Sequence, residues 1–159
     1  MGALDTGSCQ LPITQDGTCN SVALQGPTIV STCSTAAAPV PRGGAVEDGT
    51  YVLDSATTYG NCAVGAGEQR ITWVICGNAW GTVQEVQRVS GNPDAGLITE
   101  RIGLSITPQQ TSVTGSIGCW NAPGTGPSTV TWNYDATPGH LSLYIQLNPG
   151  VRVDSFTKQ

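Results

Sequence analysis

The chain of 159 residues has a net charge of −5, and only 11% of its residues are charged, against about 25% in an ordinary globular domain. Five arginines and one lysine form no basic cluster, which excludes a nucleic-acid footprint and adhesion to an anionic membrane surface. No apolar run approaches the roughly 20 residues that a membrane-spanning helix requires. The chain is long enough to bury a core without metals or oligomerisation.

Residues 1–42 are predicted to form a cysteine-containing N-terminal extension and linker, and residues 43–159 a β-domain. Within the extension, residues 22–24 and 27–33 are candidate short strands, and residues 34–44 have the proline and glycine content of a linker. The extension contains too few large apolar residues to fold alone. We therefore expect its three cysteines to close it on itself or to attach it to the β-domain.

Period-2 alternation of apolar residues predicts eight strands after residue 48. One such pattern places Leu141, Leu143, Ile145 and Leu147 on one face, and no window shows a convincing 3.6-residue period. The chain is therefore predicted to be all-β. The expected strands are residues 50–59, 70–76, 80–89, 97–107, 112–119, 129–134, 140–147 and 151–158.

The arrangement of these strands is open between a barrel and a two-sheet sandwich, because both fit the same spacing. The successive short hairpins show no long crossover of the Greek-key type. This favours an eight-stranded antiparallel up-and-down barrel, in which closure removes the exposed edges.

The six cysteines lack any C-x-x-C pair, so zinc ribbons and thioredoxin-type motifs have no support. Disulfides are the better interpretation and indicate an oxidising compartment. Fifteen pairings are formally open. Cys62 and Cys76 bracket the first predicted hairpin, and we expect them to pair. We also expect a targeting segment to have been removed before Met1, because no signal peptide follows it. The cysteines are Cys9, Cys19, Cys33, Cys62, Cys76 and Cys119.

Two short motifs carry a resemblance to a known group of proteins. The stretch GGAVEDGTYVL at residues 43–53 and the tail VDSFTKQ at residues 153–159 resemble small secreted bacterial envelope proteins or lipoproteins with a lipocalin-like (calycin) barrel. The resemblance extends in layout over roughly residues 19–159. It implies that Tyr51 closes the barrel floor under the cation of Arg152 or Lys158. It also implies a Cys19–Cys119 disulfide, which leaves Cys9 to pair with Cys33.

No catalytic, metal-binding or cofactor-binding set is expected. His140 is the only histidine, no Gly-x-Ser-x-Gly motif is present to hold a nucleophile, and no carboxylates are spaced as metal ligands. The adjacent acids Glu47 and Asp48 are better explained by turn geometry before Gly49.

The sequence leads us to expect a secreted, periplasmic or cell-surface protein without enzymatic activity. The first hypothesis is a barrel that holds a small apolar molecule in a cavity lined by Tyr51, Trp73, Leu104 and Leu143. The second is a structural protein that self-associates through its extension. The third is a carbohydrate-binding module, in which Trp80 and Trp120, beside predicted loops, stack on a glycan.

Overall fold

A computed structural model describes residues 9–11, 19–60, 62, 67–87, 97–121 and 126–159. Every regular element in this part of the chain is a β-strand, which confirms the all-β prediction. The described residues contain no helix with the length and apolar character needed to cross a lipid bilayer. The strands are β1 (Ile29–Val30), β2 (Thr32–Ser34), β3 (Gly49–Tyr59), β4 (Glu68–Cys76), β5 (Ala79–Gln87), β6 (Leu97–Pro108), β7 (Ser112–Asn121), β8 (Thr129–Thr137), β9 (His140–Gln146) and β10 (Val151–Lys158).

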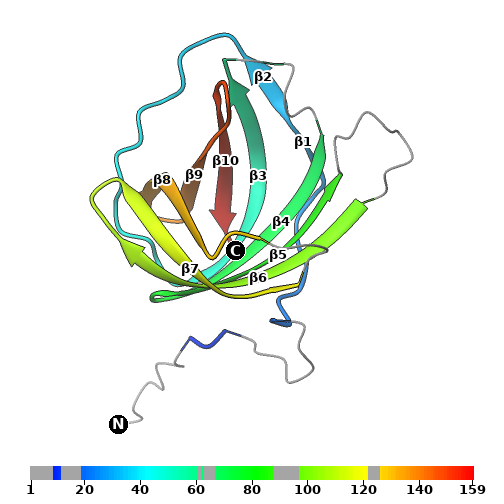
Figure 1. Cartoon of the computed structure of the whole chain (residues 1–159), viewed down its shortest axis with the longest axis vertical. Coiled ribbons are helices and arrows are strands. Elements are labelled where there is room, and N and C mark those ends of the chain that lie inside the picture. Colours follow the sequence, from blue (N-terminus) through cyan, green and yellow to red (C-terminus); the bar gives the residue numbers. More distant parts are fainter. Residues whose placement is uncertain (1–8, 12–18, 61, 63–66, 88–96, 122–125) are drawn as a thin grey trace.

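Strands β3 to β10 form a closed antiparallel barrel (Figure 1). Each strand from β4 to β9 pairs with its successor in the chain, and β3 closes the ring by pairing with both β10 and β4. Along β10 the register runs from Val151 opposite Tyr59 to Lys158 opposite Tyr51. This arrangement confirms the predicted eight-stranded up-and-down barrel and excludes the two-sheet sandwich.

The wall between β3 and β4 is completed by the N-terminal extension. β3 pairs with β4 only between Gly49 and Val52. Beyond that point β2 runs parallel to β3 from Thr57 to Tyr59, and β1 runs antiparallel to β4 opposite Gln69. Because an unpaired strand edge leaves backbone N–H and C=O groups without partners, the extension provides hydrogen bonds that the barrel alone lacks.

The extension forms less strand than predicted. Residues 27–33 contain β1 and the start of β2 as two short pieces, and residues 22–24 form no strand. Side-chain hydrogen bonds attach residues 20–22 to the barrel instead. The Asn20 amide donates to the carbonyl oxygens of Thr82 (3.2 Å) and Ile102 (3.1 Å). The Arg101 guanidinium donates to the carbonyl oxygen of Val22 at 2.7 Å. The division of the chain at residue 43 stays a prediction.

The two ends of the barrel differ in their turns and are called the base and the mouth. The base is the end with the turns at residues 77–78 and 138–139, where β3 begins and β10 ends. The mouth is the opposite end, where β3 ends at Tyr59 and β10 begins at Val151. Residues 35–48 run along the outside of the barrel from the mouth to the base (Figure 1).

The base segment, residues 43–48, lies against the base of the barrel. The Gly43 amide donates to the Tyr134 carbonyl oxygen (2.8 Å), and the Tyr134 hydroxyl donates to the Gly44 carbonyl oxygen (2.9 Å). Gly43 and Gly44 have φ values of 73° and 122°, which L side chains rarely adopt. A Cβ on Gly43 would collide with the carbonyl oxygen of Gln110, and one on Gly44 with that of Ala136. The glycine pair therefore permits close backbone contact.

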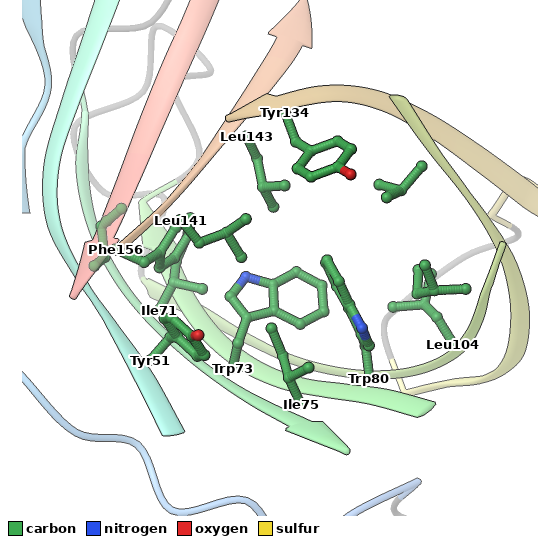
Figure 2. Packing of buried hydrophobic residues seen from close by; sticks show 13 residues of the cluster. Tyr51, Ile71, Trp73, Ile75, Trp80, Leu104, Tyr134, Leu141, Leu143 and Phe156 are labelled. Carbon is green, nitrogen blue, oxygen red and sulfur yellow. The ribbon is translucent and has the colours of Figure 1, made fainter. Parts of the chain in front are cut away.

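The hydrophobic core occupies the barrel interior, mainly on its base side. Trp73 is central: its ring centroid lies 5.8 Å from that of Trp80 and 6.0 Å from that of Trp132, both at edge-to-face angles. Figure 2 shows Tyr134 and Leu143 facing Trp73 and Trp80 across the barrel interior. The buried cluster comprises Tyr51, Leu53, Ile71, Trp73, Ile75, Trp80, Leu104, Ile106, Val113, Tyr134, Leu141, Leu143 and Phe156.

Three disulfides join the extension to the barrel: Cys9–Cys76, Cys19–Cys119 and Cys33–Cys62. The Cys19–Cys119 pair agrees with the prediction, whereas the predicted Cys62–Cys76 and Cys9–Cys33 pairs are wrong. The reason is that β4 separates Cys62, near the mouth, from Cys76 at the base. Its eight residue steps span about 26 Å at 3.3 Å per residue, far beyond the reach of a disulfide.

The disulfides should differ in their contribution to stability. Cys19–Cys119 spans 100 residues of sequence and Cys33–Cys62 spans 29. In the chain-entropy description the longer loop restricts the unfolded chain more, so the Cys19→Ser/Cys119→Ser variant should lose about 1 kcal/mol more unfolding free energy than Cys33→Ser/Cys62→Ser. Urea unfolding of both variants measures the difference. An equal or reversed order contradicts the prediction.

Candidate ligand-binding site

The four residues expected to line a ligand cavity divide into two pairs. Trp73 and Leu143 do line a cavity inside the barrel. Tyr51 and Leu104 belong to the buried cluster and do not border that cavity. Leu104 lies toward the base, where it pairs with Trp80, whereas Tyr51 is the register partner of Trp73 itself.

Trp80 and Trp120 do not form a common surface for a glycan. Trp80 is 2% exposed, packs against Trp73, and donates from its indole nitrogen to the Gly77 carbonyl oxygen at 3.2 Å. Trp120 is 36% exposed on β7 and lies opposite Ile102 in register. Only Trp120 of the two therefore presents an indole to solvent.

The residues predicted to close the barrel floor lie at different ends. Lys158 is the register partner of Tyr51 on the base side. Its ammonium group lies 3.2 Å from the Glu47 carboxylate, and the Tyr51 hydroxyl donates to the Glu47 carbonyl oxygen at 2.9 Å. Arg152 lies toward the mouth, opposite Thr58. Closure of the base thus involves Tyr51, Lys158 and the base segment, without Arg152.

The cavity has a volume of about 190 Å³ and lies between the core and the mouth. The register places it there, since Trp73 pairs with Thr82 and Leu143 with Asp154, each farther toward the mouth than the Ile75–Trp80 row. Six barrel strands contribute its walls. The lining residues are Ile71, Trp73, Thr82, Gln84, Ile102, Trp132, Leu143, Ile145, Arg152, Asp154 and Phe156.

Strand β10 supplies the charged residues of the cavity. Arg152, Asp154 and Phe156 alternate along β10, so their side chains share the inward face. The register with β3 shifts between Ser155 and Phe156, which marks a β-bulge opposite Asp54. Because β3 has one extra residue at the bulge, the side chains of Leu53 before it and Ala56 after it both face the barrel interior.

Arg152 and Asp154 form a buried ion pair. The Arg152 Nη2 donates to Asp154 Oδ2 at 3.1 Å, and Nε lies 3.0 Å from Oδ1. Nε and Oδ1 nevertheless make no hydrogen bond with each other, so we treat this second contact as electrostatic attraction. The Asp154 side chain is 2% exposed and that of Arg152 is 27% exposed. The carboxylate is therefore enclosed, while part of the guanidinium is open.

The polar groups near this pair are not fully satisfied. Within the described residues, Thr58 Oγ1, Arg152 Nε and Asp154 Oδ1 are the buried side-chain atoms without a hydrogen-bond partner. Burial raises the pKa of the Asp154 carboxyl, and the nearby Arg152 guanidinium and Gln69 side chain only partly oppose that rise. A buried polar cluster of this kind costs folding free energy and is typical of a functional site.

A second hollow of about 240 Å³ lies between the base segment and the core. Apart from Asn78 and Tyr134, its lining consists of glycines and apolar residues, including Ala45, Val46 and Trp80. The described residues that line it carry no charge, and the hydroxyl of its Tyr134 is already bonded to Gly44. This hollow offers a ligand no charged group for orientation, so the cavity near the mouth is the better candidate site.

The sequence of β10 carries a signal for the ion pair. The alternation Arg152, Asp154, Phe156 puts two opposite charges on the same strand face as an apolar ring. An inward-facing pair follows from that pattern once β10 is a barrel strand. The sequence-based prediction assigns Arg152 only to closure of the floor and assigns no role to Asp154.

The described residues provide no group of three or more His, Cys, Asp or Glu side chains that could hold a metal ion. His140 is exposed on β9, with its Nδ1 3.5 Å from the Thr157 hydroxyl. The absence of enzymatic activity and of cofactors stays a prediction. Comparisons with models of protein families, with curated proteins and with solved structures found no match. The function is therefore inferred from the barrel interior.

Removing one partner of the ion pair should cost more than removing both. Arg152→Met leaves a buried carboxylate without its cation and should lower the unfolding free energy by about 3–5 kcal/mol. The Arg152→Met/Asp154→Leu double variant replaces both charges by apolar groups and should lie within about 1 kcal/mol of the wild type or above it. Urea unfolding checks both, and a double variant as unstable as the single one contradicts the prediction.

The raised pKa of Asp154 predicts a specific pH dependence. Between the unfolded carboxyl pKa of 3.8 and the raised folded pKa, the folded state binds more protons than the unfolded state. Stability therefore falls as the pH rises through this interval. The unfolding free energy of the wild type, relative to the Arg152→Met/Asp154→Leu variant, should decline from about pH 4 upward. A relative gain in stability over that range would show that the folded pKa is lowered.

Proposed function

We propose that this chain is a secreted, non-enzymatic protein that binds one small, largely apolar molecule inside a lipocalin-like barrel. The observation that carries the proposal is the cavity near the mouth, which combines aromatic walls from several strands with one buried ion pair. Ligand sites commonly consist of a mostly apolar cavity with a few polar groups that orient the ligand. A dry apolar cavity of about 150 Å³ accommodates a benzene ring, so the volume here fits a ligand of one ring.

The disulfides support the proposed compartment. All six cysteines are paired, and such bonds persist mainly in oxidising environments such as the cell exterior and the bacterial periplasm. The likeness of residues 43–53 and 153–159 to small bacterial envelope proteins points to the same location. A disulfide-bonded barrel with an internal cavity supports a function as a carrier or receptor of small molecules more than a structural function.

The proposed function is tested by filling the cavity. Ile102→Trp places an indole in the cavity from β6, and Ser105→Trp adds the same side chain at an exposed position of that strand. Toluene and indole should bind the wild type and Ser105→Trp equally, and Ile102→Trp at least about tenfold more weakly, because the added ring occupies their site. Isothermal titration calorimetry measures the affinities, and circular dichroism checks that both variants fold.

Two outcomes would overturn the proposed function. One is that neither probe binds the wild-type protein. The other is that Ile102→Trp binds both probes as tightly as Ser105→Trp, since the probes would then occupy another site.

A further inference from the structure

The Asp154 carboxylate is not available to a ligand. Its side chain is 2% exposed, Oδ2 accepts a hydrogen bond from Arg152, and Oδ1 lies 3.0 Å from the same guanidinium. The contribution of Asp154 to the cavity is therefore its negative charge, which cancels the positive charge of Arg152.

The Arg152 guanidinium is the group that a ligand can reach. Its side chain is 27% exposed, and its contacts with Asp154 use Nε and Nη2, so the Nη1 hydrogens remain outside the ion pair. A guanidinium has five N–H donors and no acceptor. A ligand that uses this group must supply a hydrogen-bond acceptor.

The charge balance of the cavity disfavours a charged ligand. Arg152 and Asp154 are the charged residues among those that line it, and they neutralise each other. A third charge would be desolvated without a counter-charge. Near the mouth, the Glu100 carboxylate accepts a hydrogen bond from the Gln84 amide at 2.7 Å and adds a negative charge on the approach of an anion.

The remaining walls select an apolar ring. Trp73 and Trp132 stand edge to face with centroids 6.0 Å apart, and Phe156 closes the wall beside the ion pair. The other apolar lining residues are aliphatic, from β4, β6 and β9. Two uncharged polar residues also line the cavity: the Thr82 hydroxyl donates to the Thr72 carbonyl oxygen at 2.9 Å, and the Gln84 amide donates to Glu100. The Arg152 guanidinium is thus the one charged donor in a mostly apolar surrounding.

We infer that the ligand is an uncharged, ring-containing molecule whose carbonyl or similar oxygen accepts a hydrogen bond from Arg152. This inference rests on the proposed function, since it names the class of molecule that the cavity binds. It excludes carboxylates and amines as preferred ligands, and it distinguishes this site from a cavity that binds by apolar contact alone.

Four probes of nearly equal size and shape test the inference: acetophenone, α-methylstyrene, benzoate and benzamidinium. Acetophenone and α-methylstyrene differ by an oxygen in place of a methylene group, whereas benzoate and benzamidinium carry opposite charges. Acetophenone should bind about tenfold more tightly than α-methylstyrene, the effect of one hydrogen bond to a charged donor, and more tightly than either ion. Calorimetric titration at neutral pH gives the four dissociation constants.

A pair of matched variants assigns the preference to the ion pair. Arg152→Met/Asp154→Leu removes the donor, so acetophenone should lose its advantage over α-methylstyrene. Arg42→Met/Asp135→Leu makes the same replacements in an ion pair of 3.0 Å outside the cavity, where the Arg42 side chain is 75% exposed. This control should keep the preference of the wild type.

The outcomes separate the inference from the proposed function. If α-methylstyrene binds as tightly as acetophenone, or if either ion binds more tightly, the inference is wrong and binding in the cavity stands. If the double variant at Arg152 and Asp154 keeps the acetophenone preference, the inference is also wrong. If none of the four probes binds the wild type and toluene and indole also fail, the proposed function itself is wrong.

Discussion

Closure of the barrel through β3 is the constraint on which the rest of the structure depends. β3 pairs with β10 from Tyr51 to Tyr59, but with β4 only from Gly49 to Val52. The two strands diverge toward the mouth, and β1 and β2 take the open positions. The extension is therefore part of the barrel wall, and its disulfides fix the segments that complete the hydrogen bonding.

The same geometry produces an uneven interior. An eight-stranded barrel is just wide enough to be filled by side chains or to hold one small ligand. In this chain, side chains fill the base side of the barrel, and a cavity lies toward the mouth. Large rings such as Trp80 and Tyr134 fill the base side, whereas Thr82 and Ile102 stand beside the cavity. The ion pair of Arg152 and Asp154 lies where packing is incomplete, and a buried ion pair adds little to stability in comparison with apolar packing.

The strands were predictable from sequence because alternation follows directly from the pleat of a strand and the solvation of its two faces. The antiparallel order of the strands was also predictable, because strands joined by short hairpins pair with their neighbours in sequence. Two disulfides were predicted wrongly because proximity in sequence, as for Cys62 and Cys76, does not show that a strand carries the second residue to the other end of the barrel. Some inward-facing residues are packed in the core and others border the cavity. The difference depends on how the strands are staggered around the barrel, which no local sequence pattern encodes. Tyr51 and Leu104, predicted to line the cavity but packed in the core, are examples.

Each of the three disulfides joins a residue before position 43 to a residue after it. Cleavage of any single peptide bond within residues 35–42, which run outside the barrel, would therefore leave both fragments in one covalent molecule. The completing strands β1 and β2 would keep a high effective concentration next to β3 and β4. The protein can thus tolerate a nick in its longest described connection without losing a piece of its wall, for as long as its surroundings stay oxidising.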